Sequence, residues 1–176
     1  MKIIKEVLIL LRYMLLLVIT LLYALFPAVY NLMLYLTIYP TNLLINLFYS
    51  SYILNNSIIT EHVIIKIIPA CVAVSAYFLL LILNLTTDMK ARQRIYSLVF
   101  SFIALLLINI LRIFLLSILL ITQFVYFDIV HKFFWYVLSI LIVIGIWFLS
   151  VYLFKIKNIP VYTNINYLIK KIKRKK

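Results

Sequence analysis

The stretch IYSLVFSFIALLLINILRIFLLSILLI, residues 95–121, decides the fold class of this 176-residue chain. It exceeds the ~20 apolar residues that cross a bilayer as a helix, and its only charged side chain is Arg112. It does not alternate apolar and polar residues as a strand of a membrane β-barrel would. The whole chain is 68% hydrophobic and only 12% charged, whereas about a quarter of the residues in a soluble domain are charged. The sequence therefore predicts an all-α polytopic membrane protein.

Further apolar segments predict about four full transmembrane helices in total, at residues 6–26, 69–85, 95–121 and 130–154. Residues 28–52 are also apolar, but Pro40 divides them into pieces of about 12 residues. Each piece is near 18 Å long as a helix, too short to cross ~30 Å of hydrocarbon. We therefore expect a re-entrant or interfacial helical pair here, with a straight crossing as the alternative.

The following segment, residues 51–68, is more polar and predicts a short external β-hairpin lying on the bilayer. Apolar β-branched residues at Ile58-Ile59 and Val63-Ile64-Ile65 flank the polar sequence Thr60-Glu61-His62. Such a pattern is typical of two short strands joined by a turn.

Basic residues give the predicted orientation. Lysine and arginine total 17 against four acidic residues, a net charge of +13. Basic residues beside apolar helices indicate the cytoplasmic side of the membrane and binding to anionic lipid rather than to nucleic acid. The basic residues gather at the N-terminus, in the connector 86–94 and in the tail after Phe154. We therefore expect a multi-pass plasma-membrane protein with one integral membrane core, residues 1–154, and a basic cytoplasmic tail, residues 155–176.

Several kinds of site are excluded by composition. One glycine rules out a glycine-rich phosphate loop or dinucleotide fingerprint. One cysteine rules out an intramolecular disulfide and a multi-cysteine metal site. Two histidines without paired carboxylates argue against metal binding. No metal or cofactor is therefore expected.

Arg112 is the first candidate functional residue. A guanidinium within an apolar span costs about 3 kcal/mol or more unless something compensates it, so it is a functional candidate by default. Asn109 lies three residues earlier on the same helical face, within reach of the guanidinium or of a substrate carbonyl. The alternative is an arginine that extends to outer headgroups and serves as an anchor.

Cys71 and His131 each open a predicted helix from the outer side. A thiol at a helix N-terminus is favoured as thiolate, and Ser75 is expected on the same face as Cys71; a packed structural cysteine is the alternative. Asp128, three residues before His131, is placed to orient the imidazole or to cap the helix. Together with Arg112, these two residues form a nucleophile, a base and a cation at one depth, a set sufficient for acyl transfer.

Three segments carrying this set resemble the exosortase/archaeosortase family of membrane cysteine transpeptidases: PACVAVSAY (residues 69–77), NILRI (109–113) and FDIVHKFFW (127–135). The resemblance covers residues 51–154. Many members carry Cys-Ser-Gly at the nucleophile, whereas this chain has Cys71-Val72-Ala73, as in an archaeal-type branch.

The resemblance implies a protein-sorting reaction at the outer membrane face. Cys71 would attack a peptide carbonyl beside the C-terminal transmembrane helix of a substrate. His131 would accept the thiol proton, or pair with the thiolate, and protonate the leaving amine, and Arg112 would stabilise the oxyanion. The thioester would pass to an amine of a lipid or envelope component. Implied substrates carry a short motif, an apolar helix and a basic tail, and Asn109, Ser75 and Asp128 would support substrate binding or the catalytic residues.

The same residues are compatible with two other hypotheses. The chain could be a non-enzymatic membrane scaffold or permease subunit in which Arg112 contacts an anion. It could also be an intramembrane cysteine protease that transfers the acyl group to water. Reactivity of the Cys71 thiol distinguishes the enzymes from the scaffold.

Overall fold

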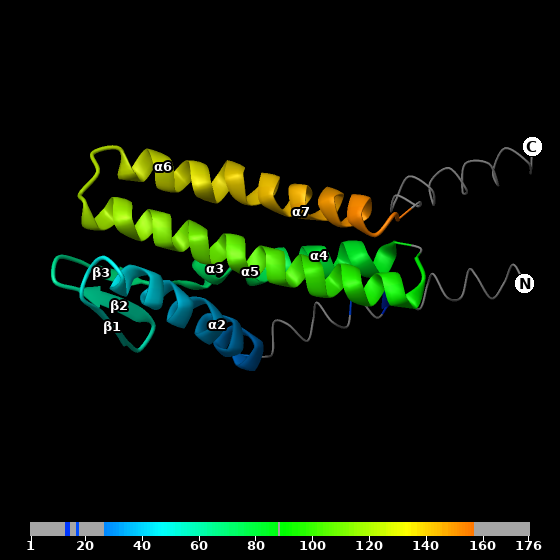
Figure 1. The fold of residues 1–176 in the computed structure, drawn as a ribbon, viewed down its shortest axis with the longest axis horizontal. Coiled ribbons are helices and arrows are strands. Elements are labelled where there is room, and N and C mark those ends of the chain that lie inside the picture. Colours follow the sequence, from blue (N-terminus) through cyan, green and yellow to red (C-terminus); the bar gives the residue numbers. More distant parts are fainter. Residues whose placement is uncertain (1–12, 15–16, 18–26, 88, 157–176) are drawn as a thin grey trace, which may run out of the picture.

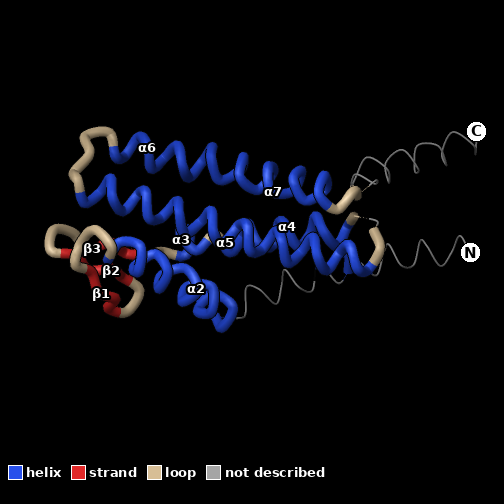
Figure 2. The backbone as a smooth tube through the Cα atoms, viewed as in Figure 1, coloured by secondary structure: helices blue, strands red, loops and turns tan. Residues whose placement is uncertain are grey.

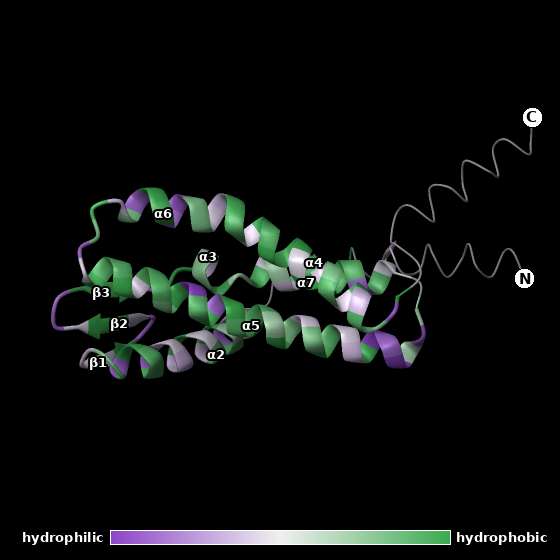
Figure 3. Cartoon of the chain, turned by 45° about the horizontal axis from the view of Figure 1, so that its top comes forward, coloured by the Kyte–Doolittle hydropathy of each residue, from purple (hydrophilic) through white to green (hydrophobic). Residues whose placement is uncertain are grey.

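A computed structural model describes residues 13–14, 17, 27–87 and 89–156. The predicted first helix, residues 6–26, and the basic tail lie almost wholly outside these residues. In the described part, three helical segments are long and apolar enough to cross a membrane: Pro69–Thr86, Ala91–Ile121 and Phe127–Leu153. They run side by side (Figure 1), and hydrophobic residues cover most of their length (Figure 3). The helical membrane-protein class is thus confirmed, while the number of four crossings stays a prediction.

The longest of these helices, α5 (Ala91–Ile121), forms the centre of the fold. Its 31 residues correspond to about 46 Å, more than one hydrocarbon thickness. It begins four residues earlier than predicted, within the expected connector, because the backbone N–H of Lys90 donates to Oε1 of Gln93 at 3.2 Å and caps the first turn. The predicted end at Ile121 is confirmed.

Residues 27–46 form one helix, α2 (Pro27–Asn46), so the prediction that Pro40 divides this segment into a helical pair is wrong. Proline removes one backbone hydrogen bond, but neighbouring hydroxyl groups can satisfy carbonyls in such helices. The buried Thr37 donates to the Met33 carbonyl at 2.7 Å, and the buried Thr41 donates to the Thr37 carbonyl at 2.7 Å. The carbonyl that loses its backbone donor at Pro40 is that of Leu36, whereas the two threonine hydroxyls add bonds to carbonyls in the adjacent turns.

A small antiparallel sheet, with strand order β1-β2-β3, follows α2 (Figure 2). The predicted hairpin corresponds to β2 (Ser57–Thr60) and β3 (Ile64–Lys66). Sequence analysis missed β1 (Ser51–Leu54), which joins β2 through the two-residue turn Asn55-Asn56. Asn55 has φ 54°, a conformation that asparagine tolerates in tight hairpin turns. The fold is therefore mainly, but not entirely, helical.

The predicted helix at residues 69–85 is broken near its start. A short helix, α3 (Pro69–Val72), is separated from α4 (Val74–Thr86) by Ala73, whose φ of 56° and ψ of 30° are left-handed. The break places Cys71 and Ser75 on different helices, so the expectation that they share one face is wrong.

The last apolar segment is continuous from residue 127 to residue 153 but not uniform. It comprises α6 (Phe127–Phe133), a π-helical turn η1 (Phe134–Leu138) and α7 (Ser139–Leu153). The helix begins three residues before the predicted start at Val130. In a π-helical turn the hydrogen bonds join residues five positions apart instead of four, and such turns often occur at functional sites.

A buried polar contact holds α4, α5 and α7 together near the start of α5. Ser97 donates to Oδ1 of Asn84, and the hydroxyl groups of Ser97 and Ser150 lie 2.7 Å apart. All three side chains are fully buried. Hydrogen bonds of this kind stabilise helix association where apolar packing alone is not selective.

Candidate functional site

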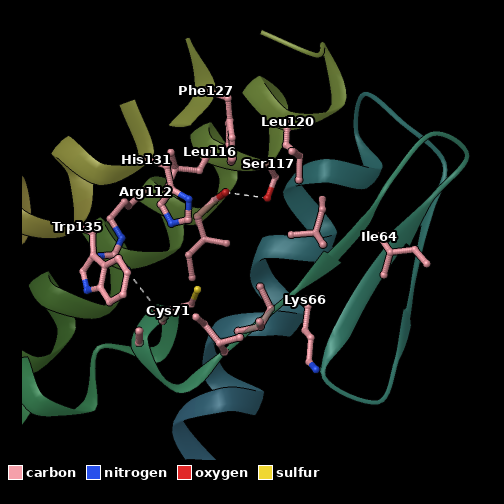
Figure 4. Close-up of a pocket in the computed structure, with 15 residues that line it drawn as sticks. Ile64, Lys66, Cys71, Arg112, Leu116, Ser117, Leu120, Phe127, His131 and Trp135 are labelled. Atoms are coloured by element: carbon pink, nitrogen blue, oxygen red, sulfur yellow. Dashed lines mark hydrogen bonds between the residues drawn. The ribbon is translucent and has the colours of Figure 1, made fainter. Parts of the chain in front are cut away.

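A cavity of about 240 Å³ lies between β3, α3, α5 and α6. Cys71, Arg112 and His131 all line it, although they belong to three different helices. In Figure 4 the His131 ring lies beside Arg112, and the sulfur of Cys71 points into the space below the ring. The three residues predicted to act together are therefore gathered at one cavity.

Cys71 is held in place through its backbone. Its N–H donates to the Ile68 carbonyl at 2.8 Å. Its own carbonyl accepts a hydrogen bond from Nδ2 of Asn109 at 2.9 Å and a longer one from Nη2 of Arg112 at 3.5 Å. Asn109 was expected to bond the guanidinium or a substrate, and it instead donates to the backbone of Cys71. The half-buried thiol is left facing the cavity.

Arg112 points into the bundle. Its Nη1 donates to Oγ of Ser139 at 2.8 Å, and Ser139 in turn donates to the Phe134 carbonyl at 2.8 Å. The guanidinium thus links α5 to both ends of the π-helical turn. Its Nε is buried and has no hydrogen-bond partner among the described residues.

The electrostatic environment of Arg112 favours an anion in the cavity. The other charged side chain on the cavity wall is Lys66, and no carboxylate of the described residues lines it. A buried cation without an anionic partner is costly. A thiolate at Cys71, or an oxyanion formed on a substrate, would supply that partner.

His131 is positioned by aromatic rings. Its ring centroid lies 5.4 Å from that of Phe127 and 6.4 Å from that of Trp135, which is stacked on it at an interplanar angle of 26°. Both aromatic residues also line the cavity. They lie one helical turn before and after His131, so the same helix supplies the imidazole and its supports.

Two predicted supporting residues do not reach the cavity. Ser75 is exposed on α4 and is absent from the cavity wall. Asp128 is also exposed and lines a neighbouring hollow with Gln123 and Phe124. Among the described residues it makes no hydrogen bond to His131, and the first turn of α6 has no side-chain cap.

Sequence analysis missed Ser139, Trp135 and Lys66. Ser139 precedes a run of ten residues that are apolar or glycine, ILIVIGIWFL, which Ser150 follows, so its position in the sequence does not distinguish it from a serine that lies away from the cavity. Trp135 and Lys66 carry no distinguishing signal either, because an aromatic residue near a helix end and an exposed lysine are common.

The arrangement supplies the elements of acyl transfer through a thioester: a thiol, an imidazole and a fixed cation around a space that admits a peptide bond. No group of three or more metal-ligating side chains is found in the part of the chain that the structure describes. Comparison of the chain with family models, with curated proteins and with solved structures gives no match.

Proposed function

We propose that this protein is a membrane cysteine transpeptidase of the kind found in the exosortase/archaeosortase family. The observation that carries the proposal is the single cavity shared by Cys71, Arg112 and His131. Each residue alone has an ordinary structural explanation, but a thiol, a cation and an imidazole on three helices have no packing reason to converge. A scaffold would not need a half-buried thiol facing a basic cavity.

In the proposed reaction His131 accepts the proton of the Cys71 thiol, and the sulfur attacks the carbonyl carbon of a peptide bond. The carbonyl oxygen becomes an oxyanion, which the Arg112 guanidinium stabilises. The C–N bond then breaks, the departing amine takes the proton from His131, and a thioester remains on Cys71. An acceptor amine then attacks the thioester and gives a proton to His131. The Cys71 sulfur leaves and takes this proton from His131, which restores the thiol.

The distribution of basic residues supports an outer location for the cavity. Lys90, Arg92 and Arg94 lie at the beginning of α5, where the positive-inside rule places the cytoplasm. Arg112 lies 21 residues after Ala91, the first residue of α5, about 31 Å along the helix. We infer that the substrate's C-terminal helix lies beside the bundle with the scissile bond near the outer surface. The acceptor amine belongs to a lipid or envelope component.

The test uses the full-length protein in its host. We expect Cys71→Ala to insert at normal abundance and to cause precursor proteins that retain a C-terminal apolar helix and basic tail to accumulate in the membrane. Cys71→Ser should leave at most a trace of processing, since a hydroxyl is much harder to ionise than a thiol. Mass spectrometry of the membrane fraction measures both.

Unchanged processing in Cys71→Ala would exclude the transpeptidase and leave the scaffold. The mass of the mature product distinguishes the remaining alternatives. A product bearing an attached amine indicates transpeptidation, whereas a free carboxyl terminus indicates a protease that transfers to water.

A further inference from the structure

The edge of β3 carries backbone groups that the sheet does not use. β3 is an outer strand in the order β1-β2-β3. The N–H of Thr60 donates to the Val63 carbonyl at 3.1 Å, and the N–H of Ile67 donates to the Asn56 carbonyl at 2.9 Å. Because ladder bonding alternates along an antiparallel strand, the odd-numbered residues here bond to the β2 side. The N–H and C=O groups of Ile64 and Lys66 therefore point away from β2.

The cavity runs along this free edge. Residues 64–68 all line it, followed by Ala70 and Cys71. Side chains of a strand alternate between the two faces, so the presence of all three β3 residues in the lining indicates that the cavity lies at the edge of the strand rather than on one face. The chain leads from the edge to the nucleophile, since the Ile68 carbonyl accepts the Cys71 N–H. Figure 4 shows this segment passing from Ile64 through Lys66 towards Cys71.

The opposite wall leaves space for another chain. It is formed by α6 and the adjoining turn, including Phe127, His131 and Trp135. No residue of α6 is buried. The charged side chains on the walls are Lys66 and Arg112, without a carboxylate from the described residues. An occupant that supplies a carboxylate is thus complementary in charge.

We propose that the substrate binds by adding a strand to β3. An extended segment that precedes its C-terminal transmembrane helix, and that carries an acidic side chain, pairs with Ile64 and Lys66 and delivers its next peptide bond to Cys71. Main-chain hydrogen bonds then supply affinity, as in other cases of strand addition. The inference rests on the proposed function, which also sets the direction. Residues 64–66 precede Cys71 in this chain, and the substrate segment precedes its scissile bond. Both strands therefore run from N- to C-terminus towards Cys71, so they pair in parallel.

The first test removes one outward-facing donor. Lys66→Pro deletes the N–H at the free edge but leaves the bonds of Ile65 and Ile67 to β2, and proline is tolerated on edge strands. Lys66→Ala is the matched control, because it loses the same side chain and keeps the N–H. The probe is the precursor that accumulates in Cys71→Ala cells. We expect its processing to be at least tenfold slower in Lys66→Pro than in Lys66→Ala at equal enzyme abundance.

The second test needs no proline variant. In Cys71→Ala protein purified with the precursor in nanodiscs, hydrogen exchange at the amides of Ile64 and Lys66 should slow at least tenfold relative to the protein without precursor. The amides of Ile65 and Ile67 should be slow in both samples, as they bond within the sheet.

The outcomes separate the two proposals. If precursor accumulates in Cys71→Ala cells, the transpeptidase proposal is kept. Strand addition is overturned in that case if Lys66→Pro and Lys66→Ala process precursor equally fast and hydrogen exchange is unchanged. Absence of any precursor overturns both. Slow hydrogen exchange at the amides of Ile64 and Lys66 without precursor also overturns strand addition. If this protection depends on protein concentration, a second copy of the chain covers the edge of β3. If it does not, the membrane covers the edge.

Discussion

Replacement of Arg112 by lysine separates a catalytic guanidinium from a membrane anchor. Arg112 uses two different nitrogens, with Nη1 donating to Ser139 at 2.8 Å and Nη2 to the Cys71 carbonyl at 3.5 Å. Lysine keeps the positive charge and a long stem, so an anchor that reaches headgroups would function as well with either residue. A single ammonium nitrogen cannot reproduce a planar fork that faces two partners.

The size of the effect follows from this geometry. If the ammonium group remains on Ser139, the nucleophile and any oxyanion beside it lose their oriented donor. Loss of one such donor reduces turnover about 10²- to 10³-fold in well-studied acyl-transfer enzymes. Because lysine retains the charge at nearly the same place, we expect the lower part of this range or slightly less, at least tenfold.

The assay is the rate of precursor processing per molecule of enzyme, followed on gels for the wild type, Arg112→Lys and Arg112→Gln. Glutamine retains hydrogen-bond donors but no charge, so it should be slower than lysine if charge stabilisation dominates. All three proteins should reach the membrane in similar amounts. Wild-type turnover by Arg112→Lys at matched abundance would refute the catalytic role and leave Arg112 as an anchor.

Three further predictions concern the support of the site. Asn109→Leu removes the donor at 2.9 Å from the Cys71 carbonyl, and we expect it to slow processing at least tenfold with little effect on abundance; undiminished processing would show that this bond does not position the nucleophile. Ser97→Ala, in the buried polar contact far from the cavity, should lower the free energy of unfolding by about 1 kcal/mol with unaltered processing per folded molecule, measured by thermal unfolding in nanodiscs. Ala73→Gly should leave the free energy of unfolding unchanged or raise it by up to about 1.5 kcal/mol, because it removes left-handed strain of ~1–2 kcal/mol at an entropy cost of ~0.5–1 kcal/mol. Ala73→Val should be destabilising, and a valine variant as stable as the glycine variant would contradict the strained backbone.

Composition and periodicity predicted the features that depend on one-dimensional patterns. Long apolar runs identify α5 and the segment from α6 to α7, because burial in lipid requires them. The hairpin of β2 and β3 follows from β-branched residues around a polar turn. Each of the three residues at the cavity has an ordinary explanation on its own, and the prediction followed from topology, which places a cation, a thiol and an imidazole of three helices at one depth.

The missed features depend on local conformational energies that tertiary contacts override. A proline usually ends a helix, but α2 continues through Pro40, and two buried threonine hydroxyls add hydrogen bonds to carbonyls in the turns beside it. β1 has two strand-favouring residues, Tyr52 and Ile53, but it is only four residues long and follows directly on an apolar helical segment, and it forms by pairing with β2. Ser75 was assigned to the face of Cys71 by helical spacing, which fails when a left-handed residue intervenes.

The left-handed backbone of Ala73 explains how the Cys71 carbonyl becomes available to side chains of α5. In a continuous helix the carbonyl of Cys71 would accept a hydrogen bond from the residue four positions on, and that residue is Ser75. The break frees this carbonyl, and Asn109 and Arg112 of α5 become its donors. The same two side chains thereby fix the Cys71 backbone and hold the Arg112 guanidinium beside it. Glycine adopts the left-handed conformation without steric cost, and under the proposed function Ala73 stands at the third position of the Cys-Ser-Gly sequence carried by many exosortases and archaeosortases. The conformational requirement of the break thus gives a physical reason for glycine at that position, and it predicts that any chain using this arrangement will place a residue tolerant of positive φ two positions after its cysteine.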